Sequence, residues 1–154
     1  MHSPLAYGMV GQLLRPRYRY YRQPEGDLES LLYRMVARLS PRRLLLGSGV
    51  PERYAESAIL ASSQLEVQRG GREPFSSVGE KDLLVTCDLD EVKTLHMLGQ
   101  GVVLLLYPHS SRERSRAFVT WAECERREGL VLDFYDGAII AHLPRVKYLY
   151  RSSL

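Results

Sequence analysis

The chain has 154 residues, of which 45% are hydrophobic and 25% charged, so it is long enough for one ordinary domain or two very small ones and too apolar for global disorder. No apolar run reaches the roughly eighteen residues that a membrane-spanning helix needs. Residues 1–22 place their charges after the apolar segment instead of before it, unlike a secretory signal. We therefore expect a cytoplasmic protein with no membrane partner.

The net charge is +3, its distribution along the chain is uneven, and most of the positive charge comes from arginine. Residues 1–50 carry eight Arg against three acids, whereas residues 51–100 carry five basic and nine acidic side chains. Arg forms forks with phosphate and stacks on bases, so a basic N-terminal third favours an anionic partner. A GC-rich genome explains the same excess without a function, and the scarcity of Asn and Gln also fits a heat-adapted source.

The first half of the chain is predicted to be mainly helical. Residues 1–26 have no periodicity, whereas apolar residues at i, i+3, i+4 and i+7 predict a helix over Asp27–Leu39. A second helix is expected to begin near Pro51 and to continue to Ser62, because Pro is favoured at the first helical position. A short strand is expected around Leu65 and Val67.

The second half is predicted to be mainly β. Asp88 and Glu91 have the spacing of a capping box, which predicts a helix that continues to Leu98. A charged loop is expected over residues 108–115. Strands are expected over residues 82–87, 102–107, 117–122, 130–135, 138–143 and 146–150.

This order indicates an α+β fold in which N-terminal helices are followed by a mostly antiparallel or mixed β half. We expect an N-terminal region over residues 1–68, a loop or linker over residues 69–80, and a C-terminal α+β domain over residues 81–154.

Basic and aromatic side chains alternate in the N-terminal arm. Residues 15–22 hold four Arg and three Tyr. Arg neutralises phosphates, and Tyr rings stack on unpaired bases, so this pattern favours single-stranded or looped RNA. The alternative is that the Tyr rings pack on the chain's own domain and the Arg heads remain in water. The candidate RNA-binding residues of the arm are Arg15, Arg17, Tyr18, Arg19, Tyr20 and Arg22.

A second basic group consists of Arg112, Arg114 and Arg116. Three Arg within five residues of a predicted loop are suited to phosphate, although Glu113 offsets part of their charge. The alternative for this segment is a solvated loop without a ligand.

The sequence contains no convincing catalytic, metal or cofactor site. His109 stands beside two serines but lacks the context of a nucleophile elbow. The GSG at residues 47–49 and the GQG at residues 99–101 lack the spacing of a phosphate-binding loop and are more typical of helix ends. Cys87 and Cys124 are far apart, without the spacing of zinc ligands. We expect no intrinsic catalysis, no metal and no cofactor.

Two acids flank a predicted hairpin turn. Asp136 and Gly137 form a tight-turn dipeptide, and Asp133 precedes them on the incoming strand. One interpretation is a solvated turn, and the other is a docking site for a basic loop of a partner.

Four segments resemble the catalytic-type domain of archaeal tRNA-splicing endonucleases. In that family a strand of the form D-F-x-x-Y is followed by H-S-x-[YF]-x-V and by V-R-K. VLLLY at residues 103–107, RSRAFV at 114–119 and RREGLVL at 126–132 are similar to these motifs. ESAILASSQLEV at residues 56–67 resembles the family's helix that leads into an L-E-V strand.

The resemblance implies a subunit without catalytic activity. The family cleaves RNA with Tyr, His and Lys, but Arg114 stands at the His position and Glu128 near the Lys position, and the Tyr has no counterpart that we can place. It implies a non-catalytic structural subunit of a hetero-oligomer that supports a separate catalytic endonuclease subunit. Structured RNA such as precursor tRNA would be the other partner.

In that family an acidic loop of one subunit inserts into a basic pocket of another. The resemblance implies this role for Asp133 and Asp136, with the last two strands as an apolar interface. The alternatives are a small nucleic-acid-binding accessory protein and a protein–protein interaction module without an RNA role. An enzyme of another class ranks last.

Overall fold

The computed structural model describes most of the chain after residue 25. The described residues are 26–71, 75, 78–98, 101–107, 112–124, 129–133, 136–141 and 147–151. The predicted RNA-binding arm at residues 15–22 lies outside them, and so do the Gly99–Gln100 and His109 positions.

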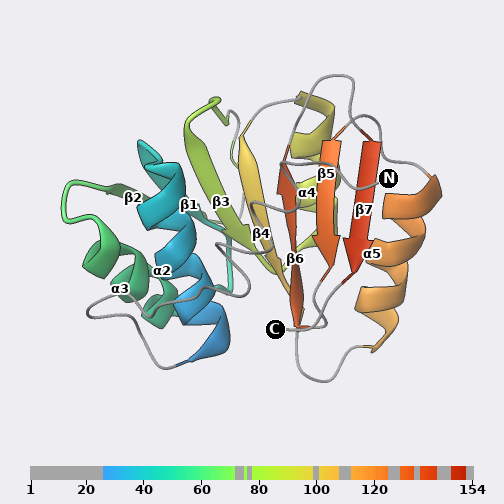
Figure 1. Cartoon of the computed structure of the whole chain (residues 1–154), viewed down its shortest axis with the longest axis horizontal. Coiled ribbons are helices and arrows are strands. Elements are labelled where there is room, and N and C mark those ends of the chain that lie inside the picture. Colours follow the sequence, from blue (N-terminus) through green and yellow to red (C-terminus); the bar gives the residue numbers. More distant parts are fainter. Residues whose placement is uncertain are drawn as a thin grey trace.

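A mixed seven-stranded sheet forms the centre of the fold (Figure 1). Its order is β2-β1-β3-β4-β6-β5-β7. The first four of these strands are parallel to one another, β6 runs antiparallel to its neighbours β4 and β5, and β7 is parallel to β5. The strands are β1 (Arg43–Leu46), β2 (Glu66–Arg69), β3 (Asp82–Thr86), β4 (Val102–Leu106), β5 (Gly129–Asp133), β6 (Gly137–Ala141) and β7 (Lys147–Arg151).

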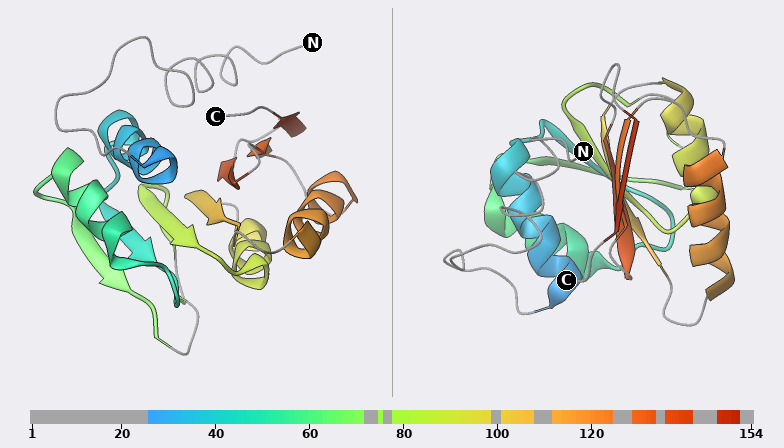
Figure 2. Two further views of the ribbon diagram at one scale, coloured as in Figure 1. Left: turned by 90° about the horizontal axis from the view of Figure 1, so that it is seen from below. Right: turned by 45° about the vertical axis from the view of Figure 1, so that its right-hand side comes forward.

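Among the described residues, four helices cover the two faces of this sheet. They are α2 (Asp27–Leu39), α3 (Glu52–Ala61), α4 (Leu89–Leu98) and α5 (Arg112–Cys124). Figure 2 shows α2 and α3 together on one face, with α4 and α5 on the other. Parallel strands require crossover connections, and α3 and α4 provide those from β1 to β2 and from β3 to β4.

Alternating side chains along each strand divide the core into two layers. Leu44 and Leu46 of β1 pack with α2 and α3, whereas Leu45 between them packs on the opposite face with α4 and α5. All three leucines are buried. Because both faces of a doubly covered sheet are apolar, β1, β3 and β4 have almost continuous hydrophobic sequences.

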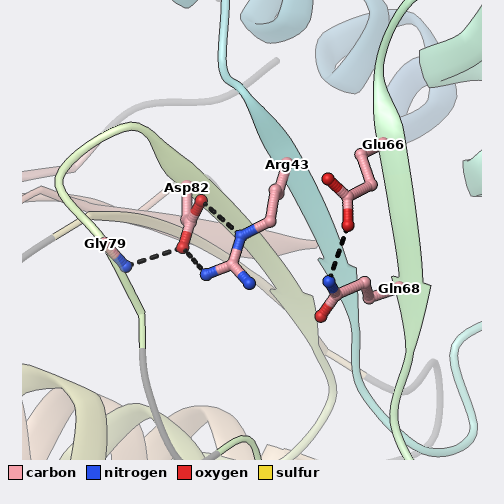
Figure 3. A network of polar contacts seen from close by, with 5 residues as sticks. All are labelled: Arg43, Glu66, Gln68, Gly79 and Asp82. Atoms are coloured by element: carbon pink, nitrogen blue, oxygen red, sulfur yellow. Dashed lines mark hydrogen bonds and ion pairs between the residues drawn. The ribbon is translucent and has the colours of Figure 1, made fainter.

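The amino-terminal edge of the parallel strands is closed by an ion pair (Figure 3). Arg43, the first residue of β1, donates from Nε to Oδ1 of Asp82 at 3.0 Å and also pairs with Oδ2, while the backbone N–H of Gly79 donates to Oδ2 at 2.6 Å. The Asp82 side chain is only 4% exposed. The Arg43 guanidinium holds the pKa of this carboxyl below its usual value. On the neighbouring strand, Gln68 donates to Glu66 at 2.8 Å.

The observed fold class corrects the predicted one. Helices alternate with strands along the chain and do not precede a separate β half, so the architecture is α/β and not α+β. β1 pairs with β3, so strands from both sides of residues 69–80 belong to one sheet. Most predicted elements are present, and the helix over Asp27–Leu39 has the expected bounds.

The main local error concerns residues 112–124. The strand predicted over residues 117–122 is wrong, and so is the last part of the loop predicted over residues 108–115, because both lie in α5. Phe118, Trp121 and Ala122 are buried at i, i+3 and i+4 against the sheet, which is helical spacing. The β-propensity of the Phe-Val-Thr-Trp segment is therefore overridden by packing.

The strand predicted over residues 138–143 has a different environment from the expected one. It forms β6, which lies between β4 and β5, and all its residues are buried in the chain's own sheet. It is therefore not available as an edge, whereas β7 does lie at one edge. In the described part of the chain no helix is long and apolar enough to span a membrane.

Candidate functional site: a cavity at the carboxyl edge

The strand order creates a switch point between β1 and β3. From β1 the chain crosses outward over one face to β2, and it then returns to continue on the other side of β1 with β3 and β4. Connections that leave neighbouring strands in opposite directions leave a crevice at their carboxyl ends, and open α/β sheets bind ligands in this crevice.

A cavity of about 550 Å³ lies at this edge, in the size range of small-molecule and cofactor sites. Its lining comes from the turn after β1, the turn after β3 with the start of α4, the end of β4, and α5. The lining residues are Ser48, Cys87, Asp88, Leu89, Asp90, Leu105, Leu106, Tyr107 and Ala117.

The turn between β1 and α3 depends on two glycines. A Cβ on Gly47 would lie 2.9 Å from Oγ1 of Thr86, so the absence of a side chain allows the turn to approach β3 closely. Gly49 has a φ of 83°, and a Cβ there would meet nothing within 4 Å. Ser48 is thereby presented at the cavity by a tight strand-to-helix turn.

The turn between β3 and α4 is held by a three-residue cap. Asp88 precedes the helix, and its Oδ1 accepts the N–H of Asp90 at 2.9 Å. The N–H of Asp88 donates to Oγ1 of Thr86 at 3.0 Å, and the Thr86 hydroxyl donates to Oε2 of Glu91 at 3.3 Å. Asp88 therefore caps the helix as predicted, but through the N–H of Asp90, and Glu91 bonds Thr86 instead of closing the reciprocal capping box.

One oxygen of this cap has no hydrogen-bond partner. Oε1 of Glu91 is buried and unpaired within the described residues. Burial raises the pKa of Glu91, and the nearby Asp88 raises it further, while the Thr86 hydrogen bond opposes the shift. Unpaired buried oxygens are uncommon in native proteins, so the carboxyl edge contains unsatisfied polarity.

Tyr107 forms a wall of the cavity directly after β4. Its hydroxyl donates to Oδ1 of Asp133 at 3.1 Å, and its backbone N–H donates to the carbonyl of Asp136 at 2.9 Å. Its ring lies 5.8 Å from the ring of Phe118, which lies 5.8 Å from that of Trp121. A continuous aromatic contact therefore connects the cavity with the chain's single tryptophan.

The charge of the lining is negative. Asp88 and Asp90 are exposed acids, and none of the lining residues that the structure describes is basic. At the end of β2, Arg69 pairs with Glu52 in the first turn of α3. Glu52 therefore places a carboxylate at a helix N-terminus, the position at which a phosphate would otherwise be stabilised.

Only some of the residues predicted as functional lie in the part of the chain that the structure describes. The six arm residues lie outside the described part, and Arg112, Arg114 and Arg116 belong to α5, where Arg116 is exposed. Asp133 and Asp136 lie at the carboxyl edge but contact Tyr107 in the same chain. Their role toward a partner stays a prediction.

The sequence interpretation missed the cavity itself. The signal that could have found it is the GSG at residues 47–49, which follows an apolar strand and precedes a helix. That context, more than the glycine spacing, marks ligand-binding turns of α/β sheets. Within the described ranges, no three side chains among His, Cys, Asp and Glu gather as a metal site would require.

Comparison with protein-family models, curated proteins and solved structures gives no match in any of the three.

Proposed function

We propose that the chain binds a small nucleoside-type ligand in the cavity at the carboxyl ends of β1, β3 and β4. The observation that supports this most is the coincidence of a cavity of about 550 Å³ with the switch point of a doubly wound sheet. Sheets of this construction bind mononucleotides and dinucleotides at that point. The fold supports this ligand class by analogy with other open α/β sheets, and the lining residues supply the chemistry.

The lining favours a ligand without phosphate groups. Asp88 and Asp90 would repel an anion, and the N-terminal turn of α3, which follows the same β1 turn as Ser48, already holds the Glu52 carboxylate in a pair with Arg69. Carboxylates accept hydrogen bonds from ribose hydroxyls and attract positive charge. A neutral or cationic nucleoside therefore fits this edge better than a nucleotide.

The apolar part of the lining is suited to a flat ring. Leu89, Leu105 and Leu106 are apolar, and Tyr107 adds an aromatic side chain with a polar end. Ligand pockets commonly combine such apolar walls with a few polar groups that orient the ligand. We assign the orienting role to Asp90 and Ser48, which line the cavity from two different turns.

Fluorescence of Trp121 provides a direct binding assay, because it is the single tryptophan and contacts the cavity wall through Phe118. We expect adenosine and the cationic nucleoside S-adenosylmethionine to bind with a Kd below about 1 mM, and AMP and ATP to bind progressively more weakly. The effect of charge should increase at low ionic strength.

A matched pair of variants locates the binding. Asp90 and Asp27 are both exposed acids in the first turn of a helix, but only Asp90 lines the cavity. Asp90→Ala should weaken binding of S-adenosylmethionine, whereas Asp27→Ala should not. Equal binding by both variants, or tighter binding of ATP than of adenosine, would contradict the proposal.

A second proposal retains the RNA-processing role. It is that the chain is a non-catalytic subunit of an endonuclease that acts on structured RNA, and it is favoured by the four Arg and three Tyr in residues 15–22. Binding of a labelled precursor tRNA should fall with salt and weaken in the triple variant Arg17→Ala, Arg19→Ala, Arg22→Ala. Unchanged binding by the triple variant would exclude the arm.

A further inference from the structure

The turn end of the β5–β6 hairpin holds Tyr107 by two hydrogen bonds, one to its side chain and one to its backbone. The side-chain hydroxyl donates to Asp133 on β5, and the backbone N–H donates to the carbonyl of Asp136, directly before β6. The pairing of β4 with β6 brings the hairpin to this position, since Leu106 lies opposite Gly137 in the antiparallel register. The wall of the cavity is therefore built by one strand and held by a hairpin later in the chain.

The two hydrogen bonds differ in how they depend on the sequence. The bond to Asp136 uses a backbone carbonyl, which any residue at that position supplies. The bond to Asp133 needs the side chain, and at 3.1 Å it joins a hydroxyl donor to a carboxylate acceptor. Hydrogen bonds to charged groups are stronger than those between neutral groups. Asp133 is thus the sequence-specific part of this connection.

The Tyr107 ring has a packed side and a cavity side. Phe118 packs against it with an angle of 53° between the ring planes, and Ala117, the residue before Phe118, lines the cavity. Tyr107 itself is 9% exposed. In such a packed setting a shift of the phenol end changes the position of the ring, and with it the shape of the cavity.

We propose that Asp133 is a positioning residue for ligand binding, which acts through Tyr107 and not through contact with the ligand. This inference rests on the proposed function, because it names the element that sets the shape of that same cavity. It assigns Asp133 a role within its own chain. The β5–β6 hairpin then becomes the segment through which events outside the cavity affect its affinity.

The test compares four variants of the full chain with adenosine and S-adenosylmethionine as probes. Asp133→Ala and Tyr107→Phe should each weaken binding by about fivefold to tenfold, the range expected for loss of one hydrogen bond. Their double variant should bind no more weakly than either one alone, because both remove the same interaction. Asp133→Asn, which keeps an acceptor oxygen, should restore binding to within about twofold of the wild type.

Asp136→Ala is the matched control, since its backbone carbonyl remains and the wild-type affinity should persist. Wild-type affinity in Asp133→Ala, additive losses in the double variant, or no rescue by Asp133→Asn would each overturn the inference. A ligand-free measurement separates it from the proposed function. In NMR spectra with labelled tyrosine, Asp133→Ala should shift the ring resonances of Tyr107 more than Asp136→Ala does. If the wild type binds neither probe, the proposed function fails, and unshifted Tyr107 resonances would overturn the positioning role as well.

Discussion

The two edges of the parallel strands show opposite kinds of chemistry. At the amino edge, Arg43 and Asp82 join the first residues of β1 and β3 in a pair whose carboxylate also accepts a backbone N–H. At the carboxyl edge of the same two strands, the turns line a cavity, and Oε1 of Glu91 is buried without a hydrogen-bond partner among the described residues. The buried carboxylate at the amino end of these strands has its hydrogen bonds, whereas a buried carboxyl oxygen at the carboxyl end lacks one within the described residues.

Packing differs between two glycines of these edges, although Gly47 at the carboxyl edge also approaches Thr86 closely. A Cβ on Gly101, at the amino edge before β4, would lie 2.8 Å from Cγ1 of Val78 and 3.2 Å from the carbonyl of Gly79. A Cβ on Gly49, in the turn at the carboxyl edge, would meet nothing within 4 Å. The buried ion pair indicates that the amino edge contributes to stability, and the cavity indicates that a ligand would bind at the carboxyl edge.

The largest effect on stability should come from breaking the amino edge. Asp82→Ala removes the acceptor of Arg43 and of Gly79 from a buried position, which should lower the free energy of unfolding by about 2–3 kcal/mol. Chemical denaturation measures this loss, with exposed Asp27→Ala as the control. Probe binding at the far edge should persist in the variant that still folds, and a loss of affinity parallel to the loss of stability would break the comparison.

A smaller loss of stability is expected at the carboxyl edge, where the turn after β1 approaches the end of β3 closely. Gly47→Ala places a methyl group 2.9 Å from Oγ1 and 3.3 Å from Cα of Thr86, so β1 and β3 must move apart at the carboxyl edge. Overpacking of this kind should cost about 1–3 kcal/mol and also weaken probe binding. The control is Gly71→Ala, where a Cβ meets nothing within 4 Å. Equal melting temperatures for the two variants would show that the turn is not tightly constrained.

The pH dependence of stability should distinguish the two carboxyls. The pKa of Asp82 is lowered mainly by its hydrogen bond with Arg43, so the folded state binds that proton less readily than the unfolded chain. The stabilisation is then complete above the ordinary pKa of aspartate, about 3.9, and is lost as the pH falls through the lowered folded value. Acid titrations should show this loss in the wild type but not in Asp82→Asn.

The stability contribution of Glu91 should depend on pH in the opposite direction to that of Asp82, and its effect should be the smallest. Its pKa is raised by burial, so the folded state holds the proton more tightly, and stability falls as the pH rises from the ordinary glutamate value through the raised one. Glu91→Gln should therefore stabilise the protein at neutral pH by about 0.5–1 kcal/mol. The gain should disappear below about pH 4, where the wild-type carboxyl is neutral in both states. A destabilised variant at neutral pH would show that the charged form is the favoured one.

The sequence predicts elements where one periodicity is clear, and it fails where tertiary contacts decide. Asp27–Leu39 carries a single apolar stripe, and α2 has these bounds. Residues 117–122 combine β-branched and aromatic types, and only their contact with the sheet reveals that Phe118 and Trp121 belong to a helix. The sequence also contains the alternation of helices and strands, but β1 and β2 have only four residues each and give weak local signals. These weak signals lead to the prediction of two halves in place of one α/β sheet.

The candidate site was harder to predict because its residues come from four separate parts of the chain. Asp88 was predicted as a helix cap, and it is one, but nothing local indicates that it also lines a cavity with Tyr107. Asp133 is predicted from the sequence as part of an acidic docking hairpin, and its hydrogen bond with Tyr107 leaves no local signal because the two residues are 26 positions apart. Register between β4, β6 and β5 creates this contact, and a single sequence does not reveal that register.

Hydrogen–deuterium exchange with and without S-adenosylmethionine tests the central claim most directly. A ligand in the cavity should slow exchange in the segments that line it, residues 86–91 and 104–107, while the amino-edge residues 79–82 and 42–44 keep their unliganded rates. Protection confined to the carboxyl edge is the result that our account predicts. Protection at the amino edge, or uniform rates with every nucleoside at millimolar concentration, would contradict it.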